Sequence, residues 1–226
     1  MALPAEQDIS GWAGSDERPH EPDETDLLRA QAYTLLAQLL ARPPSCDLLD
    51  RVGGLEGDDT PLGLAFSKLA AAARVANEHS LVREYNALFI GVARGELVPY
   101  ASFYRTGFLH DRPLIRLRED LAALGVERAD GVVEPEDHIA ALCEVMAAMI
   151  SGTLGPPDLD HQKRFFDRHL APWAGRFFAD LEHARAAKFY RPVGTIGRLF
   201  LSIETDAFAL VACASERTES LEGHSR

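Results

Sequence analysis

The sequence has few cysteines and no long apolar stretch, so it lacks the features of disulfide-linked, metal-cluster and membrane-spanning proteins. It contains only three cysteines, and Cys46, Cys143 and Cys213 follow no disulfide or metal-ligand spacing. No stretch reaches the roughly 18 consecutive apolar residues of a membrane-spanning helix, and no leader of the secretory type opens the chain. These absences favour a cytoplasmic protein whose thiols are reduced.

Basic residues are also scarce, since 23 Lys and Arg stand against 35 Asp and Glu and give a net charge of −12. An acidic surface repels phosphate backbones, which argues against nucleic acid as a partner and favours a basic peptide. Residues 1–26 alone hold eight acids and one base. With so few apolar residues, we expect residues 1–22 to be disordered, residues 23–214 to form one domain and residues 215–226 to be a polar tail.

The alternation of apolar and polar residues that is typical of β-strands is absent as well. Apolar residues instead recur at helical spacing along most of the chain. The pattern predicts an all-α fold, a single compact globular bundle of about seven to nine helices. Asp23, Thr60 and Asp111 are expected helix caps, and Pro43-Pro44 ends the first helix. The main predicted helices are 24–42, 61–77, 80–91, 113–125, 136–151, 160–181 with a bend at Pro172, and 193–214.

An aromatic-rich loop stands out within Glu84–Asp111, where helix-spaced apolar residues give way to four rings flanked by Gly and Pro. Loops are usually polar because their backbone groups need water. The rings either fold back into the core or wall a groove for an apolar peptide, and both can hold. The residues concerned are Tyr85, Leu88, Phe89, Pro99, Tyr100, Phe103, Tyr104 and Phe108.

Glu134, Asp137 and His138 form the one tight cluster of ionisable groups. Glu134 and His138 share a helix face if the helix begins early enough, and Asp137 would cap that helix. The other interpretations are a cap beside a surface imidazole, or a metal site that recruits His161 and His169. These two histidines are eight residues apart on a helix whose aromatic face suggests ordinary packing. The repeated Glu-x-x-His of di-iron bundles is absent, so we predict no metal.

Nucleotide-binding and catalytic motifs are absent too: no P-loop, no Gly-x-Gly-x-x-Gly after a strand and no nucleophile elbow occur. Gly194 and Gly197 could meet a phosphate at a helix start, but close helix packing is the favoured interpretation. We therefore predict no catalytic residues and a protein that is not an enzyme.

Four motifs in order resemble the TorD/DmsD family of redox-enzyme maturation chaperones, over about residues 24–212. They are Tyr85-x-x-Leu88-Phe89, Pro99-Tyr100-x-Ser102, Glu134-Pro-Glu-Asp137-His138 and Phe166-x-x-His169-Leu170-x-x-Trp173. The family's Glu-x-Pro-Asp-His motif maps onto Glu134, Asp137 and His138. This chain departs from it by having Pro135, and Glu136 where the family has proline.

The resemblance implies an all-helical cytoplasmic chaperone, monomer or homodimer, that binds a molybdoenzyme catalytic subunit, often through its twin-arginine leader, until the molybdenum cofactor is inserted. The sequence of residues 88–109 resembles that of family members associated with formate dehydrogenases. GTP binding is compatible with the family, although no motif here supports it. The predicted client-binding residues are Tyr85, Phe89, Pro99, Tyr100, Ser102, Tyr104, Glu134, Asp137 and His138.

Two rival classes stay open at this point. One is a helical-bundle metal-binding protein or enzyme that uses Glu134, Asp137, His138 and His161. The other is a structural oligomer subunit, which predicts an exposed apolar stripe but no affinity for peptides.

Overall fold

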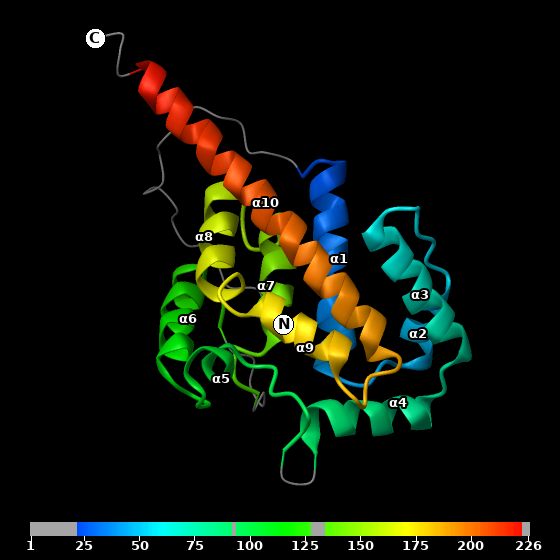
Figure 1. Ribbon diagram of the computed structural model, residues 1–226. Helices are drawn as coiled ribbons and strands as arrows, with labels where there is room; N and C mark the ends of the chain where they lie inside the picture. The colour runs from blue at the N-terminus through cyan, green and yellow to red at the C-terminus, as the bar shows by residue number, and fades with distance from the viewer. Residues whose placement is uncertain (1–21, 92–93, 128–133, 223–226) are drawn as a thin grey trace.

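The computed structural model describes residues 22–91, 94–127 and 134–222, and these residues form ten α-helices, one π-helical turn and no strand (Figure 1). The all-α class is confirmed. The helix number exceeds the expected seven to nine because the aromatic segment is itself helical and because the 160–181 pattern is divided. The segment predicted to be disordered, 1–22, lies almost wholly outside the described residues.

The helices are short except for the first, third and last. Their bounds are α1 Glu24–Ala41, α2 Cys46–Gly53, α3 Pro61–Val75, α4 Glu78–Tyr85, the π-helical turn Asn86–Ile90, α5 Ala101–Thr106, α6 Arg112–Ala123, α7 Ile139–Ile150, α8 Leu159–His169, α9 Ala174–His183 and α10 Tyr190–Glu222.

Side-chain caps start these helices where the sequence predicts them. The Asp23 carboxylate accepts from the Asp26 amide at 2.8 Å, and the Thr60 hydroxyl accepts from the Gly63 amide at 3.0 Å. Each cap satisfies a backbone N–H that has no partner within the helix. Pro43-Pro44 follows the end of α1, as expected.

Several predicted boundaries are wrong. The predicted 80–91 helix is α4 followed by the π-helical turn, and the predicted 136–151 helix begins only at Ile139. The 160–181 pattern is two helices, since Pro172 has no N–H and disfavours helical backbone before it, and Trp173 leaves the helical region at φ −151° and ψ −31°. α10 starts before residue 193 and continues past 214 into the expected polar tail. No glycine or proline interrupts residues 215–222, so nothing in the backbone stops the helix there.

The core lies where α1 packs against α7 and α10 packs against α9. In Figure 1, α10 crosses the molecule diagonally, with α2 and α3 on one side of it and α5, α6 and α8 on the other. Two glycines allow the close approach of α9 and α10. A Cβ at Gly194 would lie 2.5 Å from the Glu182 nitrogen, and one at Gly197 would lie 2.2 Å from the Phe178 ring. The helix-packing interpretation of this pair is therefore confirmed.

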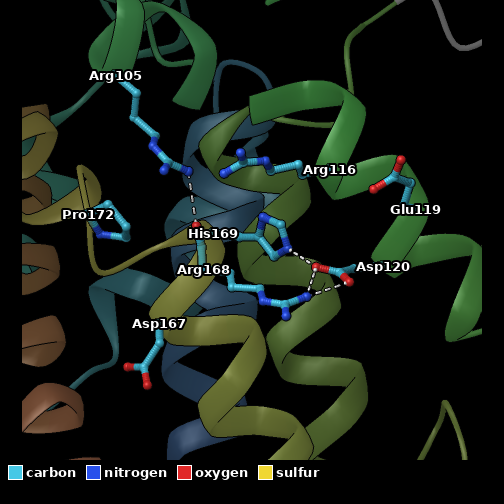
Figure 2. Close-up of a pocket in the computed structure, with 8 residues that line it drawn as sticks. All are labelled: Arg105, Arg116, Glu119, Asp120, Asp167, Arg168, His169 and Pro172. Carbon is cyan, nitrogen blue, oxygen red and sulfur yellow. Dashed lines mark hydrogen bonds and ion pairs between the residues drawn. The ribbon is translucent and has the colours of Figure 1, made fainter. Parts of the chain in front are cut away.

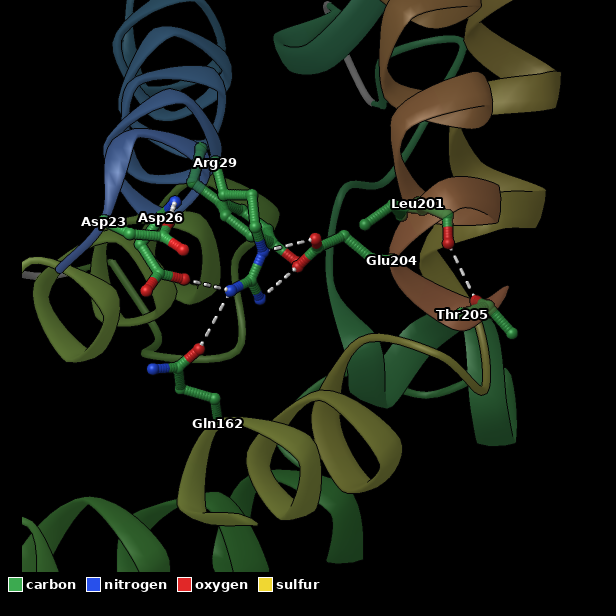
Figure 3. Close-up of polar contacts among 8 residues, drawn as sticks. Asp23, Asp26, Arg29, Gln162, Leu201, Glu204 and Thr205 are labelled. Carbon is green, nitrogen blue, oxygen red and sulfur yellow. Dashed lines mark hydrogen bonds and ion pairs between the residues drawn. The ribbon is translucent and has the colours of Figure 1, made fainter. Parts of the chain in front are cut away.

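A buried ionic network ties α1, α8 and α10 together (Figure 3). Glu204, only 1% exposed, accepts from the Arg29 Nε at 2.7 Å and from the Tyr33 hydroxyl at 3.1 Å. Arg29 also donates to Asp26 at 2.8 Å and to Gln162 at 3.3 Å. A buried carboxylate is tolerated when its partners are this complete.

Candidate functional site

Two motifs that are distant in the sequence lie side by side in the structure. The Ala101 amide donates to the Asp137 carbonyl at 3.0 Å, and the Ile139 amide donates to the Pro99 carbonyl at 2.9 Å. Tyr100 and His138 thereby form an isolated antiparallel bridge. We call residues 99–102 and 134–139 together the bridge site. The structure thus brings the aromatic segment and the Glu134–His138 motif into direct backbone contact.

Backbone geometry after α4 brings the aromatic segment to this place. The helix widens into a π-helical turn, and Gly91 ends it at φ 64°, a conformation that side chains disfavour. The chain then runs back along the turn, with the Leu97 amide donating to the Leu88 carbonyl at 2.8 Å. A Cβ at Gly95 would lie 2.5 Å from the Phe89 carbonyl carbon, so this return needs glycine.

Asp137 is fully buried and caps α5, not α7 as expected. Its Oδ2 accepts from the Ser102 amide at 2.7 Å, in the first turn of α5. The other oxygen, Oδ1, and the Ser102 hydroxyl are buried without a hydrogen-bond partner in the described residues. Such a carboxylate faces a helix start and its positive dipole, so it orders α5 and does not face solvent.

His138 is the residue that caps α7. Its Nδ1 accepts from the Ala140 amide at 3.1 Å, and its ring packs edge-on against Tyr100 with centroids 5.1 Å apart. At 6% exposed it is not a surface imidazole, so that interpretation is wrong. Burial lowers the pKa of His138 to about 4, which keeps it neutral at neutral pH. Because α7 begins at Ile139, Glu134 and His138 do not share a helix face.

Tyr100 and Glu134 form the accessible part of the bridge site. The Tyr100 hydroxyl donates to the Glu134 carboxylate; the tyrosine is half-buried and Glu134 is exposed. Glu136, which replaces the family's proline, makes an ion pair with Arg118 of α6 at 2.9 Å. The departure from the family motif thus serves to attach α6 to this segment.

The aromatic rings divide between the two interpretations that the sequence left open. The Tyr104 ring packs against Trp173 and Phe177 of the core, with centroids 5.4 and 5.9 Å apart, and its hydroxyl donates to Asp180 at 3.0 Å. Phe108, in contrast, is 72% exposed. The segment is the short helix α5 and the turn after it, which corrects the expected loop.

Tyr85 and Phe89 do not belong to the bridge site. The Tyr85 hydroxyl donates to the Leu40 carbonyl at 3.1 Å, and the rings of Tyr85 and Phe89 each lie against Tyr190. Burial raises the pKa of Tyr85 to about 12. Tyr85 is buried and Phe89 is partly buried against the core, and their part in client binding stays a prediction.

A cleft of about 450 Å³ between α6, α8 and the end of α5 was not predicted (Figure 2). In it the His169 Nε2 meets Asp120 at 2.7 Å, and Arg168 also contacts that carboxylate. The aromatic pattern of the helix that carries His169 predicts only ordinary packing. The two partners are 49 residues apart, so no local spacing could reveal them.

The ligand set of the metal hypothesis is not assembled. Among the described residues, no three His, Cys, Asp or Glu side chains are grouped so that they could hold a metal ion. His161 instead pairs with Asp158 at 2.8 Å. None of the described helices is both long enough and apolar enough to cross a membrane.

Comparisons with known proteins agree with this architecture. The sequence profile of the nitrate reductase delta subunit family matches residues 55–179, more than half of the chain. The chain belongs to this family. Chaperone protein TorD from Vibrio atlanticus is 25% identical over 203 residues, which cover 80% of this chain and 94% of the relative. TorD from Vibrio cholerae, strain El Tor Inaba N16961, is 28% identical over 174 residues, covering 66% and 77%.

A solved structure extends the agreement to the fold. The crystal structure of a protein described as a redox enzyme maturation protein from Archaeoglobus fulgidus superposes with a TM-score of 0.52 at 19% identity. It covers 83% of this chain and 99% of its own. The resemblance to TorD-type maturation chaperones, first seen in four short motifs, is therefore confirmed at the level of family and fold.

Proposed function

We propose that this chain is a cytoplasmic chaperone that binds the catalytic subunit of a molybdoenzyme and holds it until its cofactor is inserted. Family membership and relatives named as chaperones support this function. The bridge site is the surface to which we assign client binding. There the exposed Glu134 carboxylate is hydrogen-bonded to the half-buried Tyr100 ring, and buried groups hold both segments in place.

The residues of the bridge site have different roles in binding a client segment. Glu134 offers its charge to a basic group, such as the arginine pair of a leader, and Tyr100 offers apolar ring surface beside it. Asp137 and His138 are positioning residues, since both are buried and each caps a helix start. The exposed Phe108 extends the apolar area along the chain from α5.

The client itself is a finer hypothesis. The sequence of residues 88–109 suggests a formate dehydrogenase subunit as the client. The chaperone binds either the leader of this subunit or its mature part. We propose no catalytic activity and no resident cofactor. GTP binding and the choice between monomer and homodimer stay predictions of the family resemblance.

Peptide titration tests the assignment of the site. A synthetic leader peptide carrying the arginine pair, from the formate dehydrogenase subunit of the same cell, is titrated by calorimetry into wild type, Tyr100→Ala and Glu134→Gln. A charge-assisted hydrogen bond contributes about 1.5–3 kcal/mol, so Glu134→Gln is expected to weaken binding about tenfold or more. Tyr100→Ala is expected to weaken it similarly, because apolar area is lost.

Asp206→Asn is the matched control, because it removes one exposed negative charge from α10. A peptide with Lys-Lys in place of Arg-Arg tests whether the planar guanidinium groups matter. Equal affinities of all four proteins, each still helical by circular dichroism, would show that the bridge site does not bind the leader.

A further inference from the structure

The cleft between α6 and α8 carries an unusual set of charges for so acidic a chain. The side chains of Arg105, Arg116 and Arg168 line it, and Figure 2 shows His169 between them. They come from three different helices or helix ends, so the sequence does not display them as a basic run. Concave sites with a few convergent polar groups are where small ligands bind.

The acidic side chains near His169 are already neutralised. Arg168 Nη1 donates to both oxygens of Asp120, at 2.9 and 3.1 Å, and His169 Nε2 meets the same carboxylate at 2.7 Å. Partial burial opposes ionisation of Asp120, but these hydrogen bonds outweigh it and hold the pKa of Asp120 below its ordinary value. Asp167 pairs with Lys163 on its own helix.

Two guanidinium groups have no anionic partner among the described residues. Arg105 Nη1 donates to the neutral carbonyl of Arg168 at 3.1 Å. Arg116 makes no hydrogen bond or ion pair in the part of the chain that the structure describes, and in Figure 2 its side chain points across the cleft toward Arg105. The one remaining acid of the lining, Glu119, is exposed, as Arg105 and Arg116 are. With Asp120 paired to Arg168 and Asp167 paired to Lys163, the cleft therefore has an excess of one positive charge.

His169 adds a further group with a defined orientation. Its side chain is 5% exposed, and its Nε2 is engaged by Asp120. The hydrogen bond to the carboxylate favours the tautomer with its proton on Nε2. Burial lowers the pKa of His169 despite Asp120, so the ring is neutral near pH 7 and its Nδ1 can accept a hydrogen bond from a ligand that carries a proton, such as monoprotonated phosphate. The backbone carbonyl of His169 is held by the Trp173 Nε1 at 2.7 Å, so the residue is anchored at both ends.

We propose that this cleft is a binding site for a phosphate group, either free or carried as a small ester. Arg105 and Arg116 would contact its oxygens from the side of α5 and α6, and His169 would contact it from α8. Guanidinium forks suit phosphate because they donate pairs of parallel hydrogen bonds. Donors that converge from separate helices fit a tetrahedral anion better than a planar carboxylate, which one fork satisfies.

Inorganic phosphate and adenosine monophosphate are the two probes, titrated by calorimetry into the full chain at constant ionic strength maintained with sodium chloride. We expect saturable binding with one site per chain. Arg116→Gln is expected to weaken it about tenfold, since one charge-assisted contact is lost. The double variant Arg105→Gln/Arg116→Gln is expected to abolish it.

Arg112→Gln is the matched control, because this exposed arginine lies on α6 but does not line the cleft. Both substituted arginines are exposed, so the fold is expected to survive, and circular dichroism checks this. Tighter binding of the nucleotide in competition with phosphate identifies an ester as the ligand, whereas equal or weaker binding identifies the free ion. A response that does not saturate, or that is the same in wild type and the double variant, overturns the proposal.

Discussion

At the scale of single residues, the bridge site depends on Asp137. This carboxylate was predicted to be among the client-binding residues, yet it is 0% exposed and its Oδ2 caps α5 through the Ser102 amide. Its effect on binding must therefore pass through the position of α5 and Tyr100. The same residue thus links local helix capping to the geometry of the proposed site.

We predict that Asp137→Ala lowers the free energy of unfolding by about 1–3 kcal/mol, because the Ser102 amide loses its acceptor in a buried place. Asp137→Asn is expected to retain most of the stability, since its amide oxygen can accept the same hydrogen bond. Urea denaturation followed by circular dichroism measures both. If Asp137→Ala unfolds at the wild-type urea midpoint, the capping role assigned to this carboxylate is wrong.

His138 predicts a dependence of stability on pH. Burial lowers its pKa from 6.5 to about 4 in the folded protein, so between these pH values the unfolded chain binds a proton that the native chain does not. Its contribution to stability is therefore complete above about pH 6.5 and declines as the pH falls toward 4, by as much as about 3 kcal/mol.

His138→Asn isolates this contribution, because asparagine caps helices well but does not titrate. The measurement is the urea midpoint of both proteins from pH 7 to pH 4. We expect the stability of wild type relative to His138→Asn to fall as the pH decreases. Parallel curves across this range would mean that His138 titrates alike in the folded and unfolded chain.

At the scale of helices, the starts that have a local side-chain cap could be predicted, and the starts and ends that depend on tertiary contacts could not. Asp23, Thr60 and Asp111 cap helices because capping acts over three residues or fewer. The break at Pro172 was placed correctly but understated as a bend. The capping of α5 by Asp137 reaches across 35 residues, and such a contact leaves no local signal.

The candidate site was predictable to the same extent. Tyr100, Ser102, Glu134, Asp137 and His138 come together as the motif order suggests. Tyr85 and Phe89 belong to the first motif of the family resemblance, and the structure packs both rings against Tyr190. Their helical, apolar spacing is shared by core helices, so the sequence could not predict this packing.

The network around Glu204 gives a prediction about how helices are held together. Glu204→Ala leaves the Arg29 guanidinium, only 15% exposed, without its main partner, and breaking a buried ion pair in this way costs about 3–5 kcal/mol. The thermal midpoint is expected to fall clearly below that of Glu182→Ala, which breaks the more exposed pair with Arg198. Equal decreases of the thermal midpoint in the two variants would show that the buried pair contributes no more to stability than the exposed pair, contrary to this prediction.

At the scale of the whole molecule, the acidic charge is concentrated at the start of the chain, since residues 1–26 contribute a net −7 of the total −12. We predict that removing residues 1–22 leaves the melting temperature nearly unchanged, because this segment has too few apolar residues to offset the entropy of ordering it. Scanning calorimetry of the full and shortened chains measures this. A decrease of more than a few degrees would show that the segment packs on the domain.

The most direct test of the central claim is capture of the client from the source cell. Tagged wild type, Tyr100→Ala and Glu134→Gln are purified in parallel, and the proteins that accompany them are identified and assayed for molybdenum. The proposed function predicts that wild type retains a molybdoenzyme catalytic subunit low in molybdenum, and that both variants, folded as wild type, retain much less of it. Recovery of no molybdoenzyme subunit with wild type, or of equal amounts with all three proteins, would contradict the account.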